Sequence, residues 1–286
     1  MTGRIFCVLH VPKCAGSTIE AHLRKQLGGE AFWCPPKRTR KLPLEFLGRK
    51  YASGLPGPAT AIRAVSGHFI GRSIEKYFSG RQISRTLLLR RPVDLVLSWY
   101  NFRMMRYIAA GLAPYPLGLH LRSAPQDPVA NFLLERWLEL PLWTIAAMSV
   151  ERKAKLLDDA LGAFEFVGDI RECDDLVAMI SSELGIETNA EAANTSESWR
   201  KRVDWKPLRF ESLTDSCVEM IRASTQLDEY LWRRWALKER VTFRPTPSRS
   251  SPMHEWRRPY YEVIRRYARD WRSYRQEEWE LDARKL

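Results

Sequence analysis

The first thirty residues follow the pattern of a buried strand, a tight turn and a helix, and this order constrains the fold more than any other stretch. The apolar run Ile5–Leu9 is short and rich in β-forming residues, which is typical of a parallel strand buried on both faces. Apolar residues then recur every four positions, at Ile19, Leu23 and Leu27, and Gly28 is the expected helix stop. We therefore predict an α/β fold with a mostly parallel sheet flanked by helices.

The turn between this strand and helix has the composition of an anion-binding loop. It carries one lysine, one glycine and two hydroxyls, in the order Pro12, Lys13, Cys14, Ala15, Gly16, Ser17, Thr18. Free N–H groups at a helix N-terminus, together with the helix dipole, attract phosphate. The loop is not a Walker A motif, G-x-x-x-x-G-K-S/T, because Lys13 comes three residues before Gly16. An ordinary strand-to-helix turn is the alternative on this stretch alone.

The charge balance indicates an anionic partner. Lys and Arg number 46 against 34 Asp and Glu, a formal net charge of +12. No nucleic-acid-binding module is recognisable, so a nucleic-acid partner is not expected. The chain shows neither a run of about 18 apolar residues nor a signal-peptide pattern, and we expect a cytoplasmic protein without a transmembrane segment. Its five cysteines form no C-x-x-C pair or zinc spacing, which predicts reduced thiols and no metal site.

Two later segments place polar side chains directly after predicted strands. Residues 61–65 read as a strand that leads to His68, and residues 86–89 as a strand that leads to Arg90. A helix over 93–108 then carries Ser98. Ligands of open α/β sheets bind beyond the carboxyl ends of the strands, where an arginine fork and a hydroxyl can hold one phosphate together. Taken singly, a structural histidine, a surface arginine and a neutral helix serine are the plain alternatives.

The rest of the chain is assigned from periodicity and from proline and glycine positions. We expect a domain over 1–240 with an irregular basic loop at 31–60, and a C-terminal linker and amphipathic helix over 241–286. Further predicted elements are a loop at 110–127, a strand at 164–168 and helices at 128–140, 142–161, 172–184, 228–239 and 254–281. The last helix carries an aromatic stripe that would pack on the domain or on a second subunit, giving a homo-oligomer. Glycan stacking or a membrane surface is the alternative for that stripe.

Both polar segments resemble motifs of one enzyme family. Residues 12–18 resemble the P-K-T-A-G-T-S loop of sulfotransferases that use 3′-phosphoadenosine 5′-phosphosulfate (PAPS), with Cys14 in place of a threonine. The flanking His10-Val11 is closest to the carbohydrate branch, which includes the heparan-sulfate and uronyl 2-O-sulfotransferases. Residues 90–101 resemble the family's 3′-phosphate motif, R-x-P-x-x-x-x-x-S, with Arg91 where an acidic residue is common. The resemblance covers about residues 4–235.

The resemblance implies a P-loop-like sulfotransferase fold and transfer of a sulfuryl group from PAPS to an acceptor hydroxyl, without a metal. It implies a bacterial member acting on a glycan, glycolipid or small metabolite. In that family the loop, including Lys13, holds the 5′-phosphosulfate and stabilises the leaving phosphate. Arg90 and Ser98 would hold the 3′-phosphate, and the segment 194–196 resembles a part of the family fold near the cofactor.

The resemblance also makes His68 the candidate general base, because Gly67-His68 resembles the family's catalytic segment. Rival bases are His10, Glu20 and Glu75. Two other functions stay open: a P-loop-type nucleotide kinase, and a non-catalytic nucleotide- or polyanion-binding protein.

Overall fold

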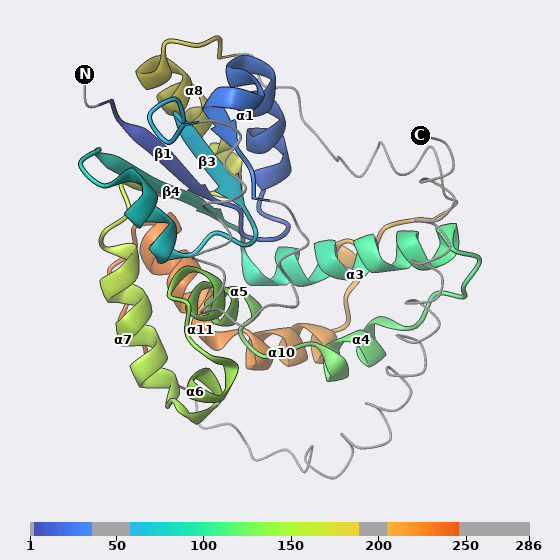
Figure 1. Ribbon diagram of the computed structural model, residues 1–286. Helices are drawn as coiled ribbons and strands as arrows, with labels where there is room; N and C mark the ends of the chain where they lie inside the picture. Colours follow the sequence, from blue (N-terminus) through green and yellow to red (C-terminus); the bar gives the residue numbers. More distant parts are fainter. Residues whose placement is uncertain (1–2, 36–57, 189–204, 246–286) are drawn as a thin grey trace. The chain divides into compact units, whose positions relative to one another are not determined.

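A five-stranded, all-parallel sheet is the centre of the domain in the computed structural model, which describes residues 3–35, 58–188 and 205–245 (Figure 1). Its strands are β1 (Ile5–Leu9), β2 (Phe32–Trp33), β3 (Ala64–Gly67), β4 (Ile83–Leu89) and β5 (Phe166–Asp169). Their spatial order is β2-β3-β1-β4-β5. Leu9 pairs with Gly67 on one side and Leu87 on the other, so the carboxyl ends meet at one edge of the sheet. The predicted α/β class, with a parallel sheet flanked by helices, is confirmed.

Helices cover both faces of this sheet. In Figure 1, α1 (Gly16–Ala31) and α8 (Cys173–Leu184) lie together on one face, and α7 (Val150–Leu161) and α11 (Gln226–Leu231) lie on the other. The other helices are α3 (Pro92–Ala109), α4 (Leu117–Ser123), α5 (Pro128–Phe132), α6 (Leu142–Ala147) and α10 (Asp215–Ser224). Short 3-10 or π-helical segments are η2 (Arg72–Phe78), η3 (Leu133–Trp137), η4 (Ile170–Glu172), η5 (Phe210–Ser212) and η6 (Trp232–Ala236). Within these described ranges, no helix has both the length and the apolarity to cross a bilayer.

Three helix boundaries predicted from single residues are confirmed. Gly28 has a φ of 70°, a left-handed value that interrupts the regular part of α1. Gly185 ends α8 with a φ of 59°. Pro92 is the first residue of α3, where its missing N–H would have had no helical partner.

Other boundaries were wrong where burial overrides local pattern. The strand predicted at 61–65 is β3, which starts at Ala64, although His68 still follows its carboxyl end directly. Phe32–Trp33 was assigned to an irregular loop, but both aromatic side chains are buried and form the edge strand β2. The predicted loop 110–127 contains α4, because Leu117 and Leu121 bury one face of a short helix.

The predicted long helices are also divided. The helix expected over 142–161 is two helices, because Ser149 caps α7 by accepting a hydrogen bond from the Arg152 N–H. The helix expected over 128–140 ends at Trp137, after the π-helical segment η3. Helix α10 was not predicted. The helix expected over 228–239 spans α11 and η6, from Gln226 to Ala236.

The Asp127 carboxylate directly precedes the helix that begins at Pro128, but it caps a different helix. It accepts hydrogen bonds from the N–H groups of Leu227 and Asp228 at the start of α11. The Asp228 carboxylate in turn accepts from Val129 and Ala130 at the start of α5. Each aspartate therefore caps the other's helix, which links two segments about a hundred residues apart.

Several predictions concern residues outside the described ranges. They are most of the basic loop 31–60, the segment 194–196 and the aromatic helix 254–281. The division into 1–240 and 241–286 and the homo-oligomer stay predictions.

Candidate functional site

The loop from β1 to α1 has an unusual backbone that exposes its N–H groups. Lys13 and Ala15 have φ values of 68° and 60°, in the left-handed region that side-chain-bearing residues rarely adopt. Within the described residues, the N–H groups of Lys13, Ala15, Gly16 and Ser17 have no hydrogen-bond acceptor. Strained backbone with unpaired N–H groups at a helix N-terminus is the usual form of an anion-binding nest.

Two cations lie against this loop. The Arg90 Nη1 atom donates a hydrogen bond to the Lys13 carbonyl at 3.3 Å. The Lys13 Nζ atom lies 4.2 Å from the ring centroid of Phe102 on α3. Burial and the nearby Arg90 guanidinium lower the pKa of the Lys13 ammonium. An anion bound between Lys13 and Arg90 would offset both the burial of the ammonium and its repulsion by the guanidinium.

The loop lies at the point where the order of strands along the sheet reverses, between β1 and β4. The chain leaves β1 toward β3 and β2, and it leaves β4 toward β5 on the other side. Lys13 follows β1 and Arg90 follows β4, so these residues flank the crevice between two diverging connections. Ligands in open α/β sheets bind at such a switch point.

Cys14, where the sequence departs from the family motif, packs inside the loop. Its side chain is 2% exposed, and its thiol lies 3.7 Å from the Pro12 carbonyl. Burial raises the pKa of this thiol to about 12. Cys14 is therefore a small neutral packing residue at neutral pH rather than a nucleophile.

His68 contacts His10, the residue that leads from β1 into the loop. The His68 Nδ1 atom is 2.7 Å from the His10 carbonyl oxygen, and the two imidazole rings pack against each other at a tilt of 35°, with centroids 3.7 Å apart. The His10 ring in turn packs on Gly16, where a Cβ would overlap it. His10 thus connects the candidate base His68 to Gly16 of the loop.

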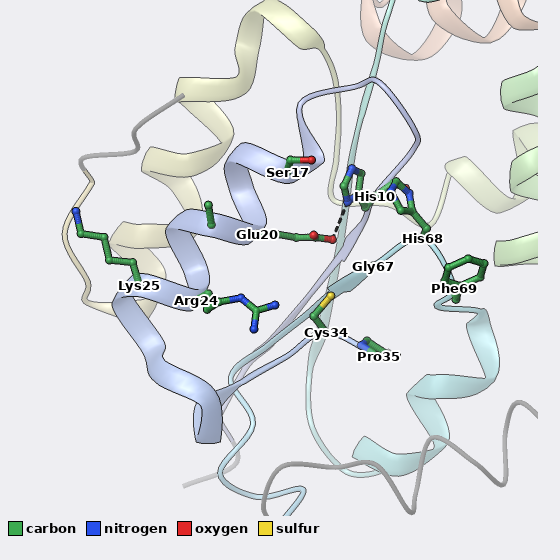
Figure 2. Close-up of a pocket in the computed structure, with 11 residues that line it drawn as sticks. His10, Ser17, Glu20, Arg24, Lys25, Cys34, Pro35, Gly67, His68 and Phe69 are labelled. Carbon is green, nitrogen blue, oxygen red and sulfur yellow. Dashed lines mark hydrogen bonds and ion pairs between the residues drawn. The ribbon is translucent and has the colours of Figure 1, made fainter. Parts of the chain in front are cut away.

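A cavity of about 480 Å³ connects this histidine pair with α1 (Figure 2). Its walls include His10, Ser17, Glu20 and Arg24 from the loop and α1, and Gly67 and His68 from the end of β3. Arg24 was not predicted as a site residue. Its helical spacing from Ser17 and Glu20 could have indicated it, because positions 17, 20 and 24 share one face of α1, away from the buried Ile19 and Leu23.

Two other predicted residues have different surroundings. Ser98 is half-buried on α3. Within the described residues it forms no hydrogen bond with Arg90, whose guanidinium bonds to the Lys13 carbonyl instead. Glu75, a rival base, forms two hydrogen bonds to Arg85 near the start of β4, at 2.6 and 2.8 Å. Since Arg85 lies toward the amino end of that strand, Glu75 does not join the site at the carboxyl edge.

Asp169 ends β5 on the same edge and was not predicted. Its carboxylate accepts hydrogen bonds from the Arg171 N–H and guanidinium and from Trp232 Nε1. Burial alone would raise the pKa of this carboxyl, but these donors hold it below its usual value. These bonds fix the start of η4 and the position of η6.

Comparisons with known proteins add little to this geometry. No protein-family model and no curated protein matches the chain. Among solved structures the chain is similar to one from a molecular and structural characterization of the PezAT chromosomal toxin-antitoxin system of Streptococcus pneumoniae. The identity is 13%, the TM-score is 0.31, and the match covers 81% of this chain and 88% of the other. A similarity of this size carries no functional argument, so the proposal below depends on the residues themselves.

Proposed function

We propose that the protein is a sulfotransferase that moves the sulfuryl group of PAPS to an acceptor hydroxyl on a glycan, glycolipid or small metabolite. The observation that carries the proposal is the loop with four unpaired N–H groups, which contains Lys13 and is contacted by Arg90. His68 lies beside it, directly after the neighbouring strand β3. A loop of the anion-binding type and a candidate base thus lie together at the carboxyl edge of the sheet. The resemblance of residues 12–18 and 90–101 to the PAPS motifs supports the choice of donor.

The chemistry needs few groups from the protein. Lys13 and the N–H groups of residues 15–17 would hold the 5′-phosphosulfate and neutralise charge on the departing phosphate, as in phosphoryl transfer. Arg90, with Ser98, would read the 3′-phosphate. The His68 Nδ1–H donates to a carbonyl, which leaves Nε2 as the nitrogen that can accept the acceptor's proton.

Ligand-dependent melting separates this proposal from its alternatives. A ligand at 100 times its dissociation constant adds about 2.7 kcal/mol, which raises the Tm of a domain of this size by about 5–10 °C. We expect that shift with adenosine 3′,5′-bisphosphate and a much smaller one with ATP. A shift with ATP and magnesium alone would favour the kinase. Binding of the bisphosphate without turnover of labelled PAPS across an acceptor panel would favour the non-catalytic binder.

Replacing Arg90 by alanine should weaken the bisphosphate selectively. Loss of a charge-assisted hydrogen bond costs about 1.5–3 kcal/mol, so we expect a 10- to 150-fold loss of affinity for adenosine 3′,5′-bisphosphate. Adenosine 5′-phosphate, which lacks the 3′ group, should lose far less. Isothermal titration calorimetry with both nucleotides measures the difference.

Arg91→Ala is the matched control for this experiment. The Arg91 guanidinium pairs with Asp94 at 3.0 Å and lies over the Phe210 ring, so its removal should leave both affinities unchanged. An equal loss for both nucleotides in Arg90→Ala would mean that Arg90 supports the loop through the Lys13 carbonyl and does not read the 3′-phosphate.

A further inference from the structure

A carboxylate stands behind the histidine pair at the edge of the cavity. The Glu20 Oε1 atom lies 2.7 Å from His10 Nδ1 and 3.2 Å from the Ser66 hydroxyl, which donates to it. The His10 ring packs against the His68 ring at a tilt of 35°. Figure 2 shows the three side chains in series, with His10 between Glu20 and His68. The series therefore runs from α1 across the end of β1 to the end of β3.

The hydrogen-bond partners determine which nitrogen of each ring carries a proton. A carboxylate and a carbonyl oxygen only accept, so His10 Nδ1 donates to Glu20 and His68 Nδ1 donates to the His10 carbonyl. Both rings then present Nε2 as the acceptor nitrogen. Glu20 is ionised in this arrangement. Burial would raise the pKa of its carboxyl, but the His10 hydrogen bond, the electrostatic attraction of the His10 and His68 rings and the Ser66 hydroxyl hold that pKa below its usual value.

The series is held in place on every side. His10 is 5% exposed, and Ser66 is fully buried in β3. Gly16 provides the space that the His10 ring occupies, because any side chain there would overlap it. A histidine that only filled space would need neither a half-buried carboxylate as partner nor a glycine beneath its ring.

We propose that Glu20, acting through His10, is a positioning residue that orients His68 and stabilises the positive charge His68 gains during the reaction. This inference rests on the proposed sulfuryl transfer. In that step the acceptor O–H bond breaks and its proton goes to His68 Nε2. The acceptor oxygen uses the freed electron pair to attack sulfur, and the bond from sulfur to the bisphosphate oxygen breaks with its electron pair leaving on that oxygen.

The other charges around His68 make Glu20 the group suited to this role. Among the described residues that line the cavity, Glu20 is the one carboxylate. The other charged groups considered line the cavity or belong to the contacts of the segment that follows His68. They are Arg24 and Lys25 of α1, Arg136 and Glu135 of η3, and Glu139 in the turn after it. The first two are cations, which oppose a charged imidazole. Arg136 lies over the Phe69 ring and pairs with Glu135, and Glu139 is bound to Ser73.

The pH dependence of turnover tests the inference, with Glu20→Gln as the variant. Glutamine keeps a hydrogen-bond acceptor for His10 and removes the charge. We expect turnover to fall by about 10- to 100-fold, less than the loss of the base itself. The acid limb of the pH profile should also move down by about one unit, since an imidazolium without its carboxylate releases its proton more readily. Glu20→Asp, which keeps the charge, should leave the limb near its wild-type position.

A measurement without turnover separates failure of this inference from failure of the proposed function. The titration of His68 can be followed by NMR of histidine-labelled protein, with the resonance assigned from its loss in His68→Asn. We expect its pKa to be lower in Glu20→Gln by about one unit. In Ser66→Ala, where the carboxylate stays, it should change little.

Each outcome has one meaning. If His68 titrates alike in wild type and Glu20→Gln, and the acid limb does not move, Glu20 does not act on His68 and the inference is wrong. If the wild type transfers no sulfuryl group from PAPS, the proposed function is wrong, whatever the NMR titration shows. A lower turnover with an unmoved limb and an unchanged titration would mean that Glu20 only supports the fold.

Discussion

His68→Ala is expected to lower turnover by about 10²–10⁴-fold at saturating substrates, the usual contribution of general-base catalysis. Affinity for adenosine 3′,5′-bisphosphate should stay within about threefold of wild type, because the base contacts the acceptor and not the nucleotide. Wild-type turnover should fall as pH drops through the histidine range, since a protonated imidazole cannot accept the acceptor's proton. Steady-state kinetics across pH, with calorimetry on the bisphosphate, measure both quantities.

His68→Asn is the matched control for the base. The asparagine amide can still donate to the His10 carbonyl, a bond that His68 Nδ1 makes at 2.7 Å, but it cannot take up a proton. We expect it to be as inactive as alanine. If either variant kept more than about a tenth of wild-type turnover, His68 would not be the base. Glu20 and His10 would then be substituted next, because both line the same cavity whereas Glu75 is bound to Arg85 elsewhere.

Lys13→Ala should lower turnover by a larger factor than it weakens binding of the cofactor. Charge on the leaving phosphate is greater in the transition state than in bound PAPS, so the lysine's contribution grows during the reaction. Removing one such electrostatic contact typically costs about 10²–10³-fold in kcat. The loss in bisphosphate affinity should be smaller. Single-turnover kinetics beside equilibrium binding separate the two effects.

Arg106→Ala controls for disturbance of the aromatic ring beside the lysine. The Arg106 guanidinium lies 5.6 Å from the Phe102 centroid, and the Lys13 Nζ atom is 4.2 Å from the same centroid. We expect Arg106→Ala to turn over like the wild type. A Lys13→Ala enzyme with normal kcat and a raised KM for PAPS would show that Lys13 only binds the cofactor, and its assigned role would be wrong.

The alternation of short apolar runs with helical periodicity was enough to predict the α/β class. Strands buried on both faces are continuously apolar, and Ile5–Leu9 has that pattern. Helix ends were predictable where one residue decides them, as at Gly28, Pro92 and Gly185. Short elements were missed, because a strand of two residues or a helix of seven is too short to show a clear hydrophobic period. Phe32–Trp33 and the helix at 117–123 form only because tertiary burial of a few side chains stabilises them.

The candidate site divides in the same way. By itself the sequence determined the order of strand, anion-type loop, histidine and arginine, because side chains that follow parallel strands must gather at one edge of the sheet. Only the tertiary structure decided that Arg90 contacts the Lys13 carbonyl, that Glu75 is bound to Arg85, and that His10 lies between Glu20 and His68. These contacts join residues that are 10 to 77 positions apart. Their geometry depends on strand register and helix packing, which no local pattern specifies.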